Sequence, residues 1–431
     1  MNSKSYTYAI AMVILLTIAT VSQAKHISTP PVFPDGTPLS DWMRDTTKID
    51  VNTLGKQYVI TDYGISADST ILQTEKIQQI IDRCAADGGG VIVIPKGTFS
   101  SGSLFFKPKT HLHLMDGAKL KGSDAIANYS IIRTRLEGKM MDYFAALVNA
   151  DRCDGFSITG KGTIDGNGTK FWEEFWLRRK VNPKCTNLEA LRPRLVYISN
   201  SNNVTVQDVR TVNSGYWTNH LYHCRNVRYL DCFIYSPTQG YPKAPSTDAI
   251  DLDVCEDVLI RGCYMNVNDD AVCLKGGKGT FVDKDSTSGP VQRIIVENCR
   301  FGQANAGITF GSEAWNCQDV ILRNCNFNGT NNMILFKMRR DTPQKYCDVS
   351  VENITGVTRD GITISKWTQF HHLEKRDDMP RSCVSNVLIK NVNLRCTRTF
   401  NNQQKNDYYD IKDIKFKRIN AKDKSGIFQM D

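Results

Sequence analysis

The sequence has little that would place it among nucleotide-binding, nucleic-acid-binding or disulfide-stabilised proteins. It contains no zinc-type paired cysteines, no phosphate-binding glycine loop and no basic run, which argues against the common nucleotide and nucleic-acid sites. Cysteine is scarce, at 14 of 431 residues, well below the density of a disulfide scaffold. The net charge of +9 fits an anionic partner without specifying nucleic acid. The 41% hydrophobic and 23% charged content is typical of a globular protein.

The first 24 residues have the pattern of a signal peptide. Lys4 is followed by an apolar stretch over residues 9–21 and by a small-x-small cleavage site at Ser22-Gln23-Ala24. An anchoring helix is the alternative, but this apolar run is short for a membrane span, and no later stretch is long and apolar enough. We therefore expect cleavage and export to the periplasm or the extracellular space, with no membrane span in the mature chain.

Seven segments of the chain share one pattern of apolar residues. Counted from the first apolar residue, i, apolar side chains recur at i, i+2 and i+5, and usually at i+7. The period of two indicates two short strands, and the three-residue step between them indicates a bend. Several cysteines fall at equivalent places of this pattern, which favours buried stacked thiols over disulfides. The segments begin at Asn203, Asn226, Asp257, Arg293, Asp319, Asp348 and Asn386.

The bend of each repeat carries a residue that tolerates a positive φ. Position i+4 therefore predicts a left-handed corner in every repeat. Successive repeats start 23 to 38 residues apart, and short units that cannot bury a core alone must stack. We predict an all-β fold, a right-handed parallel β-helix; a β-propeller is the alternative, but it needs four strands and longer repeats. The corner residues are Asp208, Asp231, Gly262, Asn298, Asn324, Asn353 and Asn391.

The front of the chain predicts a capping helix. Ile77, Ile80, Ile81 and Cys84 have helical spacing, and three glycines at 88–90 precede a strand. A helix over the open end would cover the unpaired backbone of the first turn. We expect three parts: the signal peptide (1–24), one β-helix domain (25–400), and a polar, loosely ordered C-terminal segment (401–431).

Two pieces of a further strand column bring acidic residues together. The fragments that start at Thr247 and Asp269 align without gaps, and adjacent turns lie about 4.8 Å apart. This stacks Asp248 beside the pair Asp269 and Asp270, provided that the strand ends or bulges at that pair. Lys275 and Lys337 fall on the same side of the column.

Three carboxylates this close resist joint ionisation, and splitting their pKa values supplies both an acid and a base. Solvated loop acids are the ordinary alternative, and calcium is another, although the nearby acids lack a calcium-loop spacing. His220 and His223, one turn earlier, are either substrate contacts or structural histidines. Trp217, Trp315 and Trp367 are either sugar-stacking or packed residues. The acids that invite the calcium interpretation are Asp251, Asp253, Glu256 and Asp257.

These motifs resemble glycoside hydrolase family 28, the polygalacturonase and rhamnogalacturonase family. The likeness begins at EKIQQIIDRCAADGGGVIVIPKGTF, includes GKGTIDGNG at 160–168, and continues through the repeats. Ser246-Thr247-Asp248 matches the Asn-Thr-Asp motif of the family, and Asp269-Asp270 follows 21 residues after Asp248, as in the family. By this resemblance, Asp269 is the general acid of an inverting hydrolysis, and Asp248 and Asp270 activate the water.

Two further family motifs are altered. Ala306 stands in place of the histidine before Gly307, and Leu335-Phe336-Lys337 replaces Arg-Ile-Lys. These changes favour a rhamnogalacturonan-type or branched pectin over plain homogalacturonan. Four basic residues are candidate partners for a uronate carboxylate, and for each of them the alternative is a solvated base on the surface. They are Lys275, Lys337, Arg339 and Arg340.

The sequence therefore predicts a secreted, monomeric hydrolase that acts on an acidic plant cell-wall polysaccharide or oligosaccharide, without a metal or cofactor. A calcium-dependent pectate lyase-like β-eliminase and a non-catalytic glycan-binding β-helix are the alternative functions. The retained acids favour the hydrolase over the binding protein. The segments 236–245 and 276–290 are long enough to wall off one end of a cleft, which would favour attack at chain ends over attack within the chain.

Overall fold

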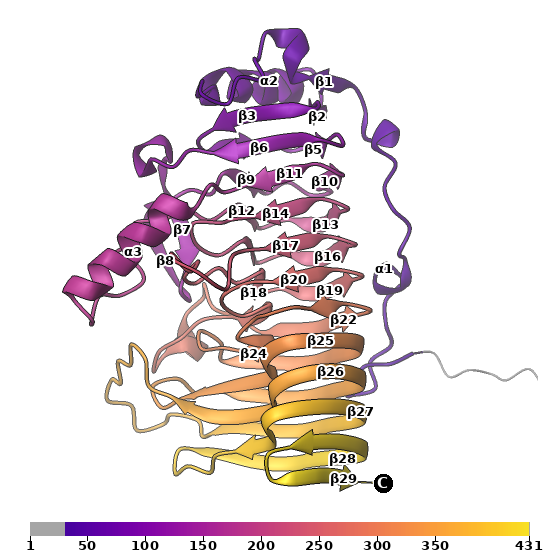
Figure 1. Ribbon diagram of the computed structural model, residues 1–431, viewed down its shortest axis with the longest axis vertical. Coiled ribbons are helices and arrows are strands. Elements are labelled where there is room, and N and C mark those ends of the chain that lie inside the picture. The colour runs from indigo at the N-terminus through magenta and orange to yellow at the C-terminus, as the bar shows by residue number, and fades with distance from the viewer. Residues whose placement is uncertain (1–30, 431) are drawn as a thin grey trace, which may run out of the picture. The chain divides into compact units, whose positions relative to one another are not determined.

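In the computed structural model, which describes residues 31–430, the unit that begins at Val32 coils into a right-handed parallel β-helix (Figure 1). The predicted fold class is confirmed. The predicted signal peptide lies outside the described residues. Within residues 31–430 no helix is both long enough and apolar enough to span a membrane.

Each turn contributes up to three strands, and each strand pairs in parallel with its equivalent in the next turn. Column A contains β1 (Gln57–Val59), β2 (Gly90–Ile94), β5 (Thr110–Leu114), β10 (Ser157–Gly160), β13 (Asn202–Gln207), β16 (Arg225–Leu230), β19 (Glu256–Arg261) and β22 (Val291–Glu297). Column B contains β3 (Gly97–Ser101), β6 (Ala118–Gly122), β11 (Thr163–Asp165), β14 (Arg210–Val212), β17 (Phe233–Tyr235), β20 (Tyr264–Asn266) and β23 (Arg300–Phe301). Column C contains β4 (Leu104–Phe106), β9 (Val148–Asp151), β12 (Val196–Ser199), β15 (Asn219–Tyr222), β18 (Ile250–Asp253), β21 (Val272–Lys275) and β24 (Ala306–Phe310).

In the later turns the strands of successive columns join into long continuous strands. The register confirms the aligned repeats, because Ile294 pairs with Val258 on one side and with Val320 on the other. All seven predicted corner residues have a positive φ, between 54° and 70°, as expected for left-handed corners. The long strands are β25 (Asn316–Arg339), β26 (Lys345–Trp367), β27 (Ser382–Gln403) and β28 (Tyr409–Asp423), followed by the short β29 (Gly426–Met430).

The interior of the coil is filled by the stacked apolar side chains of the repeats, and these form one continuous core. A ladder of thiols at the i+5 position belongs to this core, namely Cys232, Cys263, Cys299 and Cys325. All fourteen cysteines fall within the described residues, and the structure leaves each of them as a free thiol. The predicted stacked thiols are therefore present.

The N-terminal end of the coil is covered by α2 (Thr74–Ala86), and its buried residues are the predicted Ile77, Ile80, Ile81 and Cys84. The segment before it, residues 32–56, runs along the outside of the coil and includes the single-turn helix α1 (Asp41–Arg44). Its apolar side chains pack on outward-facing residues of column A, as Met43 does beside Leu259 and Ile295. Short 3-10 helices occur at Val51–Leu54, Ile60–Tyr63, Ile126–Asn128 and Val282–Lys284.

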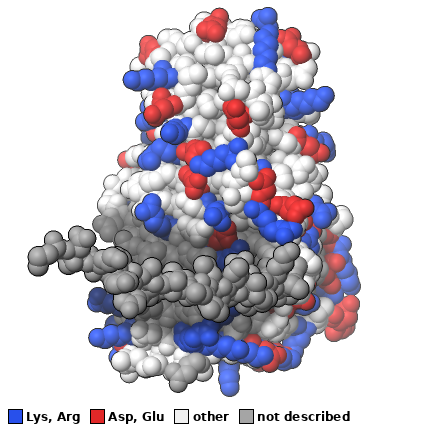
Figure 2. All heavy atoms as spheres, turned by 90° about the vertical axis from the view of Figure 1, so that its right-hand side faces the viewer, with Lys and Arg blue, Asp and Glu red and all other residues white. Residues whose placement is uncertain are grey.

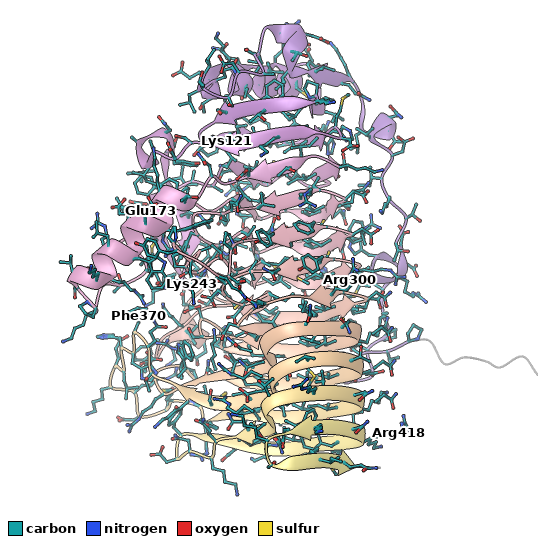
Figure 3. The ribbon with its side chains drawn as sticks, viewed as in Figure 1. Lys121, Glu173, Lys243, Arg300, Phe370 and Arg418 are labelled. Atoms are coloured by element: carbon teal, nitrogen blue, oxygen red, sulfur yellow. The ribbon has the colours of Figure 1, made fainter. Side chains whose placement is uncertain are left out.

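The longer insertions leave the coil on one side. The hairpin of β7 (Ile131–Leu136) and β8 (Lys139–Phe144) and the helix α3 (Thr169–Val181) lie on this side, and so do Lys243 and Phe370 (Figure 3). On the face shown in Figure 2, basic and acidic side chains are mixed over the described residues. The surplus of positive charge is thus not gathered into one patch on the described part of that face.

The segment after Phe400 corrects one expectation. Instead of a loosely ordered tail, β27 continues to Gln403, and β28 then adds a further turn in register. Ile414 and Phe416 of β28 pair with Val387 and Ile389 of β27. The β-helix therefore extends beyond residue 400.

Candidate active site

The predicted acidic residues meet at the N-terminal ends of column C strands. Ile250 pairs with Val272, and this register places Asp248 beside Asp270, as the aligned fragments predict. Asp269 and Asp270 precede the first residue of β21, Val272, so strand alternation does not force them to opposite faces. One carboxylate oxygen from each of Asp248, Asp269 and Asp270 lies within 4.8 Å of the others.

Burial and mutual repulsion set the protonation of this cluster. Asp248 and Asp270 are 4% and 1% exposed, and Asp269 is half-buried. Burial, followed by the charges of Asp248 and Asp270, raises the pKa of Asp269 well above its ordinary value. Burial and the neighbouring Asp251 likewise raise the pKa of Asp248. The cluster therefore holds a proton at pH values where an exposed aspartate has lost it.

Asp270 is the acid that receives the closest positive charge. Lys337 Nζ donates to its Oδ2 at 2.7 Å, and Asn305 Nδ2 donates to its Oδ1 at 2.8 Å. The Asp270 amide in turn donates to Asp269 Oδ1 at 3.0 Å. Asp270 thus accepts from one charged and one amide donor, whereas among the described residues no lysine or arginine forms an ion pair with Asp269. Two adjacent carboxyl groups thus lie in different environments, which suits an acid and a base.

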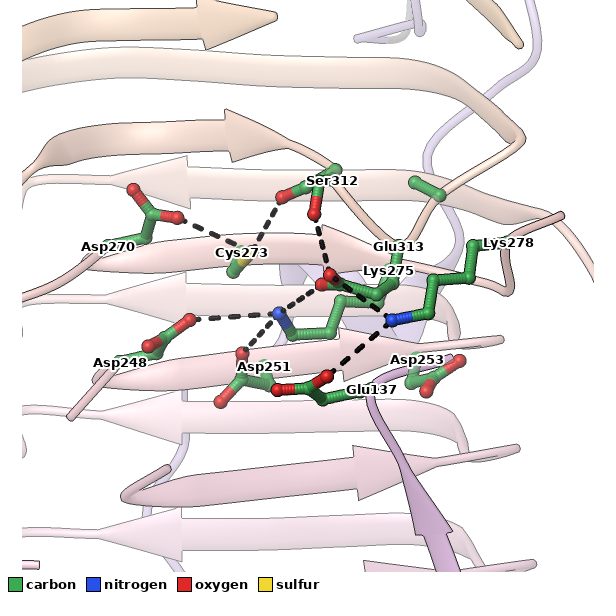
Figure 4. A network of polar contacts seen from close by, with 12 residues as sticks. Glu137, Asp248, Asp251, Asp253, Asp270, Cys273, Lys275, Lys278, Ser312 and Glu313 are labelled. Carbon is green, nitrogen blue, oxygen red and sulfur yellow. Dashed lines mark hydrogen bonds and ion pairs between the residues drawn. The ribbon is translucent and has the colours of Figure 1, made fainter. Parts of the chain in front are cut away.

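Lys275 lies among several carboxylates (Figure 4). Its Nζ is 3.3 Å from Asp251 Oδ1, 3.3 Å from Glu313 Oε2 and 3.7 Å from Asp248 Oδ2. It also lies 4.1 Å from the ring centroid of Trp217. Burial by itself would lower the pKa of Lys275, but the surrounding negative groups outweigh burial and raise it. The side chain is only 3% exposed, and its ammonium group remains charged inside the protein because of these negative neighbours.

Two glutamates complete the network, and sequence reasoning missed both. Glu313 follows β24, and Glu137 lies in the turn between β7 and β8. Lys278 lies between them, 3.5 Å from Glu137 Oε2 and 3.9 Å from Glu313 Oε1. Extending the column C alignment three residues beyond Phe310 would have reached Glu313. Glu137 is outside the repeats, so no periodic signal could have found it.

The acidic cluster, the two glutamates, Lys275 and Lys337 line a cleft of about 310 Å³. Its floor is the outer side of column C, and the acids, the two lysines and several amides project into it. The amides of Asn268 and Asn305 come from the residues before β21 and β24. The lining residues are Glu137, Asn187, Tyr216, Trp217, Ser246, Asp248, Asn268, Asp269, Asp270, Lys275, Asn305, Ser312, Glu313, Asn331, Lys337, Trp367 and Gln369.

Three of the predicted substrate contacts lie outside this cleft. His220 is fully buried, with Nδ1 2.7 Å from Arg194 Nη1, and burial lowers its pKa to about 3. His223, at the other end of β15, is 3.1 Å from Asn200 and lines a separate cavity. Arg339 is 1% exposed and donates to both oxygens of Asp341 at 2.8 and 2.7 Å. His220 and Arg339 are thus held in buried contacts with other groups of the protein, and His223 lies outside the cleft.

Two of the three tryptophans line the cleft. Trp217 is 3% exposed, and its ring stacks on Tyr216 with centroids 5.3 Å apart. Trp367 is half-buried, and Lys337 Nζ lies 4.7 Å from its ring centroid. Trp367 thus leaves ring surface available to a ligand, whereas Trp217 mainly supports Lys275.

The acids that suggested calcium are mostly paired with arginines. Arg135 donates to both oxygens of Asp253, at 3.0 and 3.3 Å, and Arg293 donates to Asp257. Among the described residues, both groups of three potential metal ligands contain Asp248. One is the acidic cluster itself, and the other joins Asp248 to Asp251 and Cys273.

The two altered motif positions carry no polar group into the cleft. Ala306 is fully buried and follows Asn305, whose partner across the turn is Asp269. Leu335 is 5% exposed and pairs with Thr309 in the column. Neither position supplies a donor for a carboxylate.

Comparison with known proteins finds one matching family model and several relatives. The model of the family "Glycosyl hydrolases family 28" matches residues 84–415. A probable polygalacturonase of Vitis vinifera is 26% identical over 272 residues, which are 61% of this chain and 52% of that protein. The match thus spans about half of that relative. An exo-poly-alpha-D-galacturonosidase of Dickeya chrysanthemi is 35% identical over 149 residues, 32% of this chain and 24% of that protein.

Solved structures show the same fold. An exopolygalacturonase of Thermotoga maritima superposes with a TM-score of 0.68 at 21% identity, covering 86% of this chain and 93% of that one. A family 28 exopolygalacturonase of Yersinia enterocolitica gives 0.64 at 19% identity, covering 85% of this chain and 78% of that one.

Proposed function

Because this chain belongs to glycosyl hydrolases family 28, we propose that it hydrolyses a glycosidic bond in a galacturonate-containing pectic glycan. The observation that carries the proposal is the cluster of Asp248, Asp269 and Asp270 in the cleft, with one oxygen of each within 4.8 Å of the others. Several relatives are named polygalacturonases or exopolygalacturonases, which supports galacturonate as part of the substrate.

Asp269 is the proposed general acid. Its raised pKa keeps a proton available, and its half-buried side chain lines the cleft, where a leaving-group oxygen can approach it. Asp270, held by Lys337 and Asn305, is the better base for the attacking water. Asp248 lies on the adjacent turn and holds the water together with Asp270.

The proposed stereochemical outcome is inversion, carried from family membership. The spacing within the cluster, with nearest oxygens within 4.8 Å, is shorter than the roughly 6.5–9.5 Å between the carboxyl groups of a typical inverting pair. Proton NMR of the first product formed decides the point, since inversion requires that the new anomer differ from the linkage cleaved.

The finer substrate proposal is a rhamnogalacturonan-type or branched pectin. It rests on Ala306 and Leu335, which cannot bind a carboxylate, and on Arg339, which is already paired with Asp341. A glycan in which galacturonate alternates with neutral sugars would need fewer cations in the cleft than plain homogalacturonan.

We further propose attack at chain ends, because one end of the cleft is walled by three segments. Gly138, in the β7–β8 turn, lies against Glu313 and Gly277, and Lys278 bridges Glu137 and Glu313. The loop 276–290 is tied to the segment 368–380, where Arg376 pairs with Asp283 at 2.6 Å. We call the part of the cleft that these three segments bound, and that Glu137 and Glu313 line, the closed end of the cleft. Early products of a single short size support chain-end attack, and a ladder of long fragments contradicts it.

We also propose that the chain is cleaved after Ala24, that it is exported, and that it acts as a monomer. N-terminal sequencing of protein recovered outside the cytoplasm tests the cleavage site, and light scattering tests the oligomeric state.

One assay tests the proposed reaction against the alternatives. Rhamnogalacturonan and homogalacturonan oligosaccharides are incubated with the enzyme, with and without a chelator, and new reducing ends and ultraviolet absorbance are followed. We expect reducing ends that survive the chelator, without ultraviolet-absorbing products. Absorbance that requires calcium would indicate a β-eliminase, and binding without cleavage would indicate a glycan-binding protein.

Asp269→Asn should abolish turnover while the fold remains intact. An amide cannot donate the proton, and loss of general acid catalysis typically costs on the order of 10²–10⁴-fold in rate. The matched control is Asp116→Asn, in an exposed turn between β5 and β6. Near-native activity of Asp269→Asn, with the unfolding midpoint of the wild type, would show that the acid is another residue.

A further inference from the structure

Three lysines in or beside the cleft are engaged by carboxylates of the protein itself. Lys275 has three carboxylate partners within 3.7 Å, and Lys337 has Asp270 at 2.7 Å. Lys278 lies between Glu137 and Glu313, at 3.5 and 3.9 Å. Their side chains are 3%, 8% and 15% exposed, respectively, so none can turn far from its partners. A uronate carboxylate in this cleft would meet no uncommitted lysine among these three.

The closed end presents two carboxylates, and each of them is paired with a lysine. Glu137 Oε1 accepts hydrogen bonds from Tyr216 at 2.7 Å and from Asn187 at 3.1 Å. Glu313 Oε1 accepts from Ser312 at 2.6 Å, and the neighbouring lysines lower the pKa of Glu313 although burial opposes them. Both glutamates line the cleft. The walls of the closed end therefore present two carboxylates whose positions are fixed by surrounding donors.

We propose that the closed end of the cleft binds a sugar without a free carboxylate and excludes a uronate, and that Glu137 and Glu313 determine this choice. The proposal rests on the proposed function, since it concerns one subsite of the same cleft. It adds a rule that family membership does not state: the sugar at the closed end of this enzyme is neutral.

The chemistry of recognition follows from the groups present. A carboxylate oxygen accepts up to two hydrogen bonds, and the hydroxyl groups of a neutral sugar are donors. Glu137 and Glu313 can thus receive sugar hydroxyls in addition to their protein donors. A uronate in the same place would lose part of its hydration beside lysines that already have carboxylate partners, so no uncommitted cation among these three would offset that cost.

The experiment compares three trisaccharides that differ in one carboxyl group. They are trigalacturonate and the two forms in which either the reducing-end or the non-reducing-end carboxyl is reduced to an alcohol. We expect one singly reduced form to be hydrolysed with a kcat/KM at least about tenfold above that of the all-acid form, because burying a carboxylate beside lysines that are already paired is strongly unfavourable. Equal values for all three overturn the proposal.

Glu313→Gln tests the residue assignment, because the amide keeps the shape and releases one partner of Lys275. The ratio between the reduced and the all-acid substrates should fall at least about threefold in the variant, since Lys275 and Lys278 lose a carboxylate partner and can then pair with a uronate. Glu174→Gln, on the exposed face of α3, is the matched control and should keep the wild-type ratio. An unchanged ratio in Glu313→Gln and in Glu137→Gln removes both residues from this role.

Failure of the proposed function is distinguishable from failure of this inference. If no trisaccharide is hydrolysed, calorimetric binding of the same three compounds to the Asp269→Asn variant still measures the selectivity. Tighter binding of one reduced form supports a neutral subsite even then, and equal binding of all three rejects it.

Discussion

At the scale of single residues, the site is organised by charges that the protein itself compensates. Lys337 shows this most clearly. Its place in the altered Arg-Ile-Lys motif suggests a contact to a uronate, but its ammonium group lies 2.7 Å from Asp270. Its primary partner in the structure is therefore a carboxylate of the acidic cluster.

The contact with Asp270 determines the expected result of the substitution Lys337→Met. Removing the cation leaves Asp270 buried beside Asp269 without its closest positive partner, so the loss should affect every substrate. A charge-assisted contact worth roughly 1.5–3 kcal/mol corresponds to about one to two decades in kcat/KM. We expect equal losses on a uronate-containing glycan and on its carboxyl-reduced analogue. A loss confined to the acidic glycan would restore the direct uronate contact.

Asp251 carries a prediction about pH and stability. It is fully buried beside Asp248, and burial raises its pKa to about 7 although Lys275 opposes this. The folded protein therefore holds a proton that an unfolded chain releases near pH 4. Its contribution to stability is complete below the unfolded pKa and is lost as the pH rises through the folded value.

Asp251→Asn should accordingly stabilise the protein at high pH and have little effect at low pH. The amide cannot ionise, so the cost of a buried charge disappears, and the side chain can still accept from Lys275. Thermal unfolding midpoints at about pH 4 and about pH 8 measure the difference. A variant that is destabilised more at the higher pH would show that the Asp251 charge is needed by Lys275.

At the scale of the structural element, the repeat is defined by its corners. Asn324 has φ 55°, and its side-chain oxygen accepts from Asn353 Nδ2 at 2.9 Å, while Asn353 accepts from Asn391 at 2.8 Å. The residue immediately before each first apolar position is also left-handed, which the repeat pattern alone did not reveal. These second corners are Asn203, Asn226, Asp257, Arg293, Asp319, Asp348 and Asn386.

Asn324→Ala should lower the free energy of unfolding by roughly 1–2 kcal/mol, because alanine lacks the short polar side chain whose local hydrogen bonds let asparagine adopt the left-handed region. Asn324→Gly should lose less, since glycine adopts this conformation freely and gives up only the exposed contact to Asn353. Activity should be unchanged in both variants. Denaturant unfolding compares them, and equal stability of the two variants would mean that the left-handed corner contributes nothing.

At the scale of the whole chain, the sequence was most informative where one pattern repeats. Seven copies of the spacing predicted the stacked strands, and the same register brought Asp248 to Asp270 because a sheet repeats at a fixed distance. The walls of the cleft were not predictable in this way. Glu137 and Lys278 come from insertions without a repeat, and their positions follow from tertiary packing.

The C-terminal turn was missed for a specific reason. Ile414, Phe416 and Ile419 have the spacing i, i+2 and i+5, but the corner residue is Arg418 instead of asparagine, aspartate or glycine. Arg418 nevertheless adopts φ 50°. The frequent lysines of this segment face outward and give it the composition of a tail. The apolar spacing was therefore a better guide here than the polarity of the segment.

This last turn leads to a prediction for the molecule as a solenoid. Ile414, Phe416 and Ile419 of β28 cover Val387, Ile389 and Val392 of β27. Beyond them, Phe428 of β29 packs against Phe400 and Phe416, with ring centroids 5.0 and 5.5 Å away. The terminal repeats of a solenoid shield an otherwise open end from solvent and from other chains.

Truncation after Gln403 should therefore yield a chain that associates, although every residue of the cleft remains. The truncated end presents the apolar side chains and unpaired backbone of β27, which invites pairing with a second copy. We expect dye binding to exposed apolar surface, and aggregation that increases with protein concentration. Phe428→Ala, which removes only the outermost ring, should stay soluble and lose stability alone. A truncated chain that remains monomeric, with the unfolding midpoint of the full chain, would show that β28 and β29 are dispensable for the end of the coil.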